Sequence, residues 1–153
     1  MKINIRKIMC PLDFSESSDH ALLYAKAFAQ AHGADILLMH CVETPVYYTS
    51  PDVGMPPETV EQHKQLCERQ LAEAATALRA ENLKVQIELV TGSPFLQVVR
   101  MARKEGVDLI VMGTHGRTGL AHVLMGSVAE KVVRKAPCPV LTVKHPEHEF
   151  VMP

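Results

Sequence analysis

The sequence predicts a single α/β domain in which helices cover both faces of a mostly parallel sheet. Apolar runs of strand length alternate with segments of helical periodicity along the whole chain of 153 residues. Some of these runs, such as residues 34–42 and 107–112, are almost continuously apolar, which is typical of strands buried on both faces. Right-handed crossovers between such strands place helices on both sides of the sheet. We expect one domain over residues 1–145, followed by a short polar tail over 146–153.

The first strand is expected near residues 3–9, and a helix over residues 15–33 follows it. Ser15 or Ser17 suits the N-cap of this helix, because a hydroxyl accepts a hydrogen bond from a first-turn amide. Gly33 suits its end, since glycine readily adopts the left-handed conformation that is common there. Helical spacing predicts an apolar face made of Leu22, Ala25, Phe28 and Ala29.

The second strand is expected over residues 34–42. Residues 44–57 hold four prolines and a glycine, a composition that predicts a loop. A long helix over about residues 58–81 follows the loop. Its predicted buried stripe consists of Leu66, Leu71, Ala74, Ala75 and Leu78.

The third strand and third helix are expected over residues 83–92 and 93–106. The strand shows alternating apolar residues, which indicates one buried face. The helix has both of its ends marked. Ser93 is a good N-cap, Pro94 suits the first helical position, and Gly106 suits the stop after the last turn.

The chain ends with a strand over 107–112, a helix over 126–136 and a strand over 138–144. A last strand at the edge of a sheet exposes unpaired N–H and C=O groups. Pairing with the same strand of a second copy satisfies these groups through a two-fold contact. The alternative is an edge protected by the tail and by Pro137 and Pro139.

The charge and composition of the chain limit the classes of partner that we expect it to bind. The formal net charge is −1 and the pI about 6.7, so no basic excess points to nucleic acid or to a membrane surface. The first ten residues lack the apolar core of a signal peptide, and no run approaches the ~20 apolar residues that span a bilayer. We therefore expect a cytoplasmic protein. Reduced thiols, rather than disulfides or a zinc site, are expected at the widely spaced Cys10, Cys41, Cys67 and Cys138.

A glycine-rich stretch, GTHGRTGLAHVLMGS over residues 113–127, follows the fourth strand. Gly113 and Gly116 let the chain leave the strand tightly and expose backbone N–H groups that can form an anion nest. Gly126 and Ser127 open the last helix, whose N-terminus favours an anion. The stretch lacks the Gly-Lys-Ser/Thr of a Walker A loop. By spacing alone, it fits a phosphate cradle and a plain turn equally well.

Asp13 stands at the end of the first strand, and ligands of parallel sheets bind at such ends. Its carboxylate can accept hydrogen bonds from ribose hydroxyls or help to hold Mg²⁺ against phosphate oxygens. The alternative is that Asp13 only caps the following helix, since DFSES is a natural helix entry.

Three segments together resemble the universal stress protein family, in its ATP-binding subclass. They are CPLDFSESSDHAL near the start, ILLMHCVE in the second strand, and the block from residue 106 to 144, which carries the full G-x2-G-x9-G-S pattern. The resemblance covers about residues 4–144. It implies a three-layer α/β/α fold with a five-stranded parallel sheet in the order 3-2-1-4-5, and a homodimer joined through residues 139–144.

The resemblance also implies an adenine nucleotide site, with ATP, ADP or AMP as the ligand and Mg²⁺ beside the phosphates. Asp13 would face the ribose or the metal, Pro11 and Leu12 would line the adenine side, and the backbone of Cys41 would contact the adenine edge. The remaining site residues would wrap the phosphates or close the site from the helix end. They are Met112, Gly113, Thr114, His115, Gly116, Arg117, Gly126, Ser127 and Val128.

The function expected from this resemblance is a dimeric, nucleotide-responsive module of the stress response. Hydrolysis is expected to be slow at most, because no P-loop lysine, arginine finger or obvious base is present to drive phosphoryl transfer. Two other hypotheses stay open. One is an adenylyl-transferring enzyme on a related scaffold, and the other is an interaction protein that binds no nucleotide.

Overall fold

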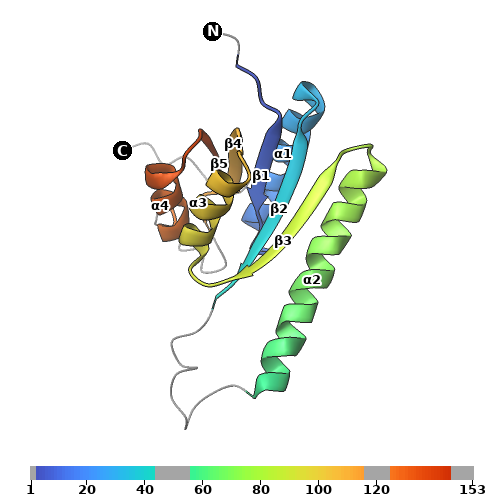
Figure 1. The fold of residues 1–153 in the computed structure, drawn as a ribbon, viewed down its shortest axis with the longest axis vertical. Helices are drawn as coiled ribbons and strands as arrows, with labels where there is room; N and C mark the ends of the chain where they lie inside the picture. Colours follow the sequence, from blue (N-terminus) through green and yellow to red (C-terminus); the bar gives the residue numbers. More distant parts are fainter. Residues whose placement is uncertain (1–2, 44–55, 116–124, 146–153) are drawn as a thin grey trace.

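The computed structural model describes residues 3–43, 56–115 and 125–145, and it confirms the predicted fold class (Figure 1). Its five strands form one sheet in the order β3-β2-β1-β4-β5, and every neighbouring pair is parallel. The strands are β1 (Lys7–Pro11), β2 (Asp35–Val42), β3 (Val85–Thr91), β4 (Leu109–Gly113) and β5 (Val140–Val143). The helices are α1 (Glu16–His32), α2 (Pro57–Ala80), α3 (Pro94–Lys104) and α4 (Ser127–Lys135).

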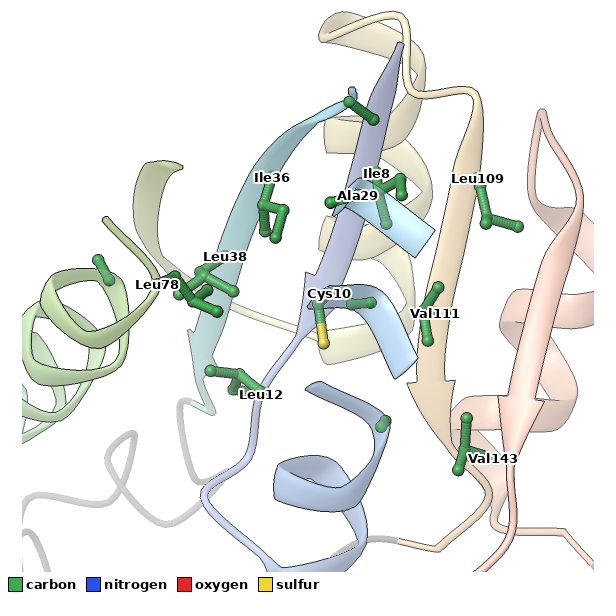
Figure 2. Packing of buried hydrophobic residues seen from close by; sticks show 14 of the residues in the cluster. Ile8, Cys10, Leu12, Ala29, Ile36, Leu38, Leu78, Leu109, Val111 and Val143 are labelled. Atoms are coloured by element: carbon green, nitrogen blue, oxygen red, sulfur yellow. The ribbon is translucent and has the colours of Figure 1, made fainter. Parts of the chain in front are cut away.

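Helices cover both faces of the sheet, and each face has its own apolar core. On one face α1 and α2 pack against the sheet through buried alanines and leucines, while α3 and α4 pack on the other face. Successive residues of β1 alternate between the two cores: Ile8 and Cys10 belong to the first and Met9 to the second. Figure 2 shows the first core, with Cys10 and Val111 on neighbouring strands. The continuous apolar runs of the sequence are therefore strands that are buried on both faces, as predicted.

The predicted bounds of the first helix are confirmed, and those of the first strand are shifted. Ser15 caps α1 by accepting a hydrogen bond from the Ser18 amide, and Gly33 ends it at φ 64°. The first strand begins later than the predicted residues 3–9. Its ladder with β2 begins at Lys7, opposite Asp35, because β2 itself begins only after the turn at Gly33.

The predicted buried stripe of α2 is confirmed at Leu71, Ala75 and Leu78 and is wrong at Leu66. Leu66 is 46% exposed, whereas its neighbour Cys67 is 1% exposed. The reason is helical spacing: a step of four residues back from Leu71 reaches Cys67, and a second such step reaches His63. The buried stripe therefore runs from Cys67 to Leu78, and the exposed His63 continues the same helix face to the cavity described below.

The strand order places a topological switch point at β1. The chain goes from β1 to β2 on one side and returns to β4 on the other, so crossovers leave in opposite directions. A crevice forms at the carboxyl ends of strands at such a point. Among the described helices, none has the length and apolar character needed to cross a membrane.

Candidate functional site

A cavity of about 510 Å³ lies at the carboxyl ends of β1, β2 and β4. Ligand pockets in proteins commonly enclose about 300–1,000 Å³, so this volume suits a small organic molecule. The first residues of α3 and α4 and one side chain of α2 complete the lining. The cavity therefore forms at the place where the strand order reverses.

The predicted site residues that lie within the described ranges all line this cavity. They are Pro11, Leu12, Asp13, Cys41, Met112, Gly113, Thr114, His115, Gly126, Ser127 and Val128. The other two, Gly116 and Arg117, lie outside the described residues. The fold thus brings together segments more than a hundred residues apart in the sequence, from Pro11 to Val128.

Asp13 does not cap α1 itself. Its Oδ1 accepts a hydrogen bond from the backbone N–H of Ser15, at 3.0 Å, and another from the Ser15 hydroxyl. The Ser15 Oγ in turn accepts from the Ser18 amide at 3.2 Å and is the N-cap. The carboxylate of Asp13 therefore braces the capping residue and also lines the cavity. The interpretation of Asp13 as the cap is wrong.

The segment around Asp13 is held from β2 by His40. The Leu12 carbonyl accepts a hydrogen bond from His40 Nδ1 at 2.6 Å. The ring of Phe14 lies 4.5 Å from the His40 ring, centroid to centroid, at an angle of 35°. Phe14 itself has φ 61°, a left-handed conformation that costs a residue with a Cβ about 1–2 kcal/mol. Contacts to His40 thus flank Asp13 on both sides.

Gly113 is required by the packing of β4 against α1. A Cβ added at this position would lie 2.5 Å from Ser17 Oγ and 3.0 Å from the carbonyl carbon and oxygen of Ser17. Real Cβ atoms do not approach other atoms so closely, and part of this obstacle is the backbone of the first turn of α1. Glycine at this position lets the end of β4 approach the N-terminus of α1, a reason that spacing along the sequence does not reveal.

The two ends of the glycine-rich stretch are hydrogen-bonded to each other. The Gly126 N–H donates to the Thr114 carbonyl at 2.6 Å, and the Thr114 N–H donates to the Val143 carbonyl at 3.0 Å. Thr114 is 3% exposed, and its hydroxyl lies 2.9 Å from His115 Nδ1. The segment that leaves β4 and the segment that enters α4 therefore meet at one buried residue.

The N-terminus of α4 faces the cavity. Gly126 is its N-cap, with φ −68° and ψ 157°, and has no side chain that could cap the helix. Ser127, Val128 and Ala129 form the first turn and line the cavity. First-turn N–H groups have no partner within a helix, and the helix dipole adds positive potential there. This end of the cavity therefore suits an anion.

Cys41 lies near the end of β2 and lines the cavity. Its thiol donates a hydrogen bond to the Gly92 carbonyl at 3.3 Å. Burial, with a smaller contribution from the Glu43 carboxylate, raises the pKa of this thiol to about 11. The thiol is therefore protonated near neutral pH, a state that reacts slowly with oxidants and alkylating agents.

Sequence reasoning missed several lining residues, of which His40, Glu43 and His63 carry chemistry. His63 is an exposed residue one turn before Cys67 on α2, and its Nε2 is 3.7 Å from Cys67 Sγ. His40 is part of the quoted second-strand sequence, but an alternation pattern does not distinguish a core histidine from one that lines a site. Among the described lining residues, Asp13 and Glu43 are acidic, and none is a lysine or arginine.

Comparison with known proteins identifies relatives over nearly the whole chain. The model of the universal stress protein family matches residues 4–144. Universal stress protein MJ0577 of Methanocaldococcus jannaschii is 33% identical, and the match covers 94% of this chain and 98% of that protein. A solved structure of MJ0577 superposes with a TM-score of 0.84 at 32% identity, again over 94% of this chain and 98% of the other.

Two more distant structures share the fold. A universal stress protein in complex with cAMP has a TM-score of 0.68 at 23% identity, and covers 93% of this chain and 98% of its own. A universal stress protein from Archaeoglobus fulgidus, in complex with dAMP, has a TM-score of 0.62 at 21% identity. That superposition covers 92% of this chain and 98% of the other.

Proposed function

The chain belongs to the universal stress protein family, and we propose that it binds an adenine nucleotide in the cavity at the switch point. The ligand is ATP, ADP or AMP, and ATP binds as its magnesium complex. One observation carries this proposal: the N-terminus of α4, with Gly126 as its N-cap, and the carboxylate of Asp13 line the same cavity of about 510 Å³. The first suits phosphate and the second suits ribose hydroxyls.

The lining suggests how the nucleotide lies. We place the phosphates against the first turn of α4, where N–H groups and the Ser127 hydroxyl are available as donors. The ribose then lies against Asp13, and the adenine against Pro11, Leu12 and the backbone at Cys41. The cAMP and dAMP complexes of two proteins with the same fold support an adenine nucleotide as the ligand class.

Magnesium fits the site only together with phosphate. Within the described ranges, no three His, Cys, Asp or Glu side chains gather in a way that would hold a metal ion. Mg²⁺ commonly binds through one or two carboxylates, substrate phosphates and water. We propose Asp13 as its protein ligand, as the alternative to the contact of Asp13 with the ribose. The ion would offset the repulsion between a polyphosphate and the lining carboxylates Asp13 and Glu43.

We propose a binding module with at most slow hydrolysis. Fast phosphoryl transfer uses a cationic side chain on the transferred phosphoryl group and a residue that orients the nucleophile. The described part of the lining contains no lysine or arginine. We also propose that the protein acts in the cytoplasm as part of a stress response. All four cysteines are free, which suits a reducing compartment.

Calorimetric titration with MgATP, ADP and AMP tests the proposed site. Asp13→Ala is expected to weaken ATP binding about tenfold or more, because a hydrogen bond to a charged group contributes about 1.5–3 kcal/mol. Asp35→Ala is the matched control, since this exposed carboxylate lies at the opposite end of β2 and is expected to leave the affinity unchanged. Absence of heat with all three nucleotides would contradict the proposal. Release of pyrophosphate with an acceptor present would favour the adenylyl-transferring enzyme instead.

We propose a homodimer through the edge strand β5, residues 139–144. The carbonyl groups of Pro139 and Val143 accept hydrogen bonds from Ile110 in β4 and from Thr114 just after it. The alternate residues Val140 and Thr142 therefore direct their backbone groups away from β4. A second copy can pair with these outward-directed groups of Val140 and Thr142. Thr142→Pro removes an outward N–H and spares the ladder with β4, so it is expected to convert dimers into folded monomers. Sedimentation analysis measures this, and a variant that remains dimeric would place the interface elsewhere.

A further inference from the structure

We propose that His40 is a positioning residue that holds Asp13 in place for the ribose of the nucleotide. The inference rests on the proposed nucleotide site and adds a residue to it. His40 is 5% exposed, lies on β2, and lines the cavity. Its part is to fix the backbone on both sides of Asp13, so that the carboxylate keeps one position relative to the end of β2.

The hydrogen bond to Leu12 is the first of the two contacts. A carbonyl oxygen only accepts, so the 2.6 Å contact requires a proton on His40 Nδ1. The Leu12 N–H donates to the Met39 carbonyl at 2.7 Å. Leu12 is therefore bonded to β2 through both its N–H and its C=O, although β1 ends at Pro11. The His40 side chain thus adds a second bond to the residue that follows the strand.

The ring contact with Phe14 is the second. Phe14 has the left-handed φ of 61°, which a residue with a Cβ adopts at a cost, so surrounding contacts must hold it there. Its ring lies against the His40 ring, with centroids 4.5 Å apart. The turn at Phe14 directs the chain from β1 toward the cap at Ser15, whose N–H and hydroxyl bind Asp13 Oδ1. The position of the carboxylate thus depends on a turn that His40 supports.

The position of His40 in the chain gives this arrangement a consequence for specificity. His40 directly precedes Cys41, whose backbone we place beside the adenine. One residue of β2 therefore connects the adenine side of the cavity to Asp13 on the ribose side. Loss of this connection is expected to weaken recognition of the ribose hydroxyls while the phosphate contacts at α4 remain.

Two variants separate the contacts of His40. His40→Phe keeps an aromatic ring and removes the donor to Leu12, whereas His40→Asn keeps an N–H near the Nδ1 position and removes the ring. His40→Phe is expected to weaken ATP binding about tenfold, the effect of one lost hydrogen bond to a critical group, and His40→Asn less. His32→Phe is the matched control, because this exposed histidine lies at the far end of α1.

The decisive readout is the ratio of affinities for ATP and for 2′,3′-dideoxy-ATP. His40→Phe is expected to bring this ratio close to one, and to add no more than about twofold to the loss caused by Asp13→Ala, since coupled residues are not additive. Equal weakening of both nucleotides, or full additivity with Asp13→Ala, would show a purely structural role and overturn the inference. Phe14→Leu removes only the ring contact and is expected to lower the ratio of affinities to a smaller extent. This variant replaces His40→Phe in the test if His40→Phe does not fold.

A measurement without nucleotide separates this inference from the proposed function. Hydrogen exchange at the Ser15 amide reports its bond to Asp13 Oδ1, and exchange at Ala34, bonded to the Ala29 carbonyl, reports the far end of α1. His40→Phe is expected to accelerate exchange at Ser15 and leave Ala34 unchanged. Unchanged exchange at Ser15 would overturn the positioning role. If the wild type binds no nucleotide but exchange at Ser15 is faster in His40→Phe, the proposed function is refuted and the positioning role of His40 is not.

Discussion

Gly113→Ala is expected to destabilise the ligand-free protein by about 3 kcal/mol, although the change adds a single methyl group. The added carbon would lie 2.5 Å from Ser17 Oγ and 3.0 Å from two backbone atoms of Ser17. The hydroxyl can rotate away, but the backbone belongs to the first turn of α1 and cannot move without shifting the helix. A shift of α1 disturbs a core that includes Ala21 and Ala25, both 0% exposed. Urea unfolding without nucleotide measures the effect.

Gly33→Ala is the matched control for this change. Gly33 has φ 64° and nothing within 4 Å of an added Cβ, so alanine there costs only the left-handed conformation, about 1–2 kcal/mol. Ser17→Ala combined with Gly113→Ala is expected to restore part of the loss, because it removes Oγ and leaves the backbone obstacle. If Gly113→Ala costs no more than Gly33→Ala, close packing is not the reason for glycine at position 113.

Ser127→Pro is expected to weaken ATP binding about tenfold or more while the fold keeps its stability. Ser127 is the first residue of α4, a position where proline is favoured, and α3 already begins with Pro94. Gly126 has φ −68° and ψ 157°, the extended conformation that a residue before proline requires. The substitution therefore removes one N–H and one hydroxyl from the proposed phosphate site without straining the helix. Calorimetry with ATP measures the loss.

Two controls identify which group matters. Ser127→Ala removes the hydroxyl and keeps the N–H, so its effect is expected to be the smaller one. Adenosine has no phosphate, and its affinity is expected to be the same for the wild type and for Ser127→Pro. If Ser127→Pro weakens adenosine and ATP equally, the phosphates do not bind at α4. Unchanged ATP affinity in this variant would lead to the same conclusion.

The alternation of strands and helices and the ends of the helices were predictable from local patterns, whereas the sheet order was expected only from the resemblance to the family. Apolar runs, Ser15 before α1 and Gly33 after it are signals that lie within a few residues of the feature they specify. The gathering of Asp13 and Ser127 at one cavity was also predictable, since the carboxyl ends of parallel strands meet at one edge of a sheet.

Other features of the site arise from packing between distant segments. The need for glycine at position 113 depends on how closely α1 approaches β4. The contacts of His40 with Leu12 and Phe14 depend on the path of the chain after β1. His63 reaches the cavity because α2 is rotated about its axis so that Cys67 is buried and Leu66 is exposed. The types of these two residues do not predict that rotation. These three features follow from the three-dimensional packing and have no signal in the neighbouring sequence.

Thr114 connects the end of the cavity at α4 to the edge strand β5 through two backbone hydrogen bonds. Its C=O accepts from Gly126 at the start of α4, and its N–H donates to Val143 in β5. A ligand that displaces this buried residue acts on both neighbours at once. Thermodynamic reciprocity then applies: the factor by which association of two copies changes the affinity for a nucleotide equals the factor by which the nucleotide changes their association.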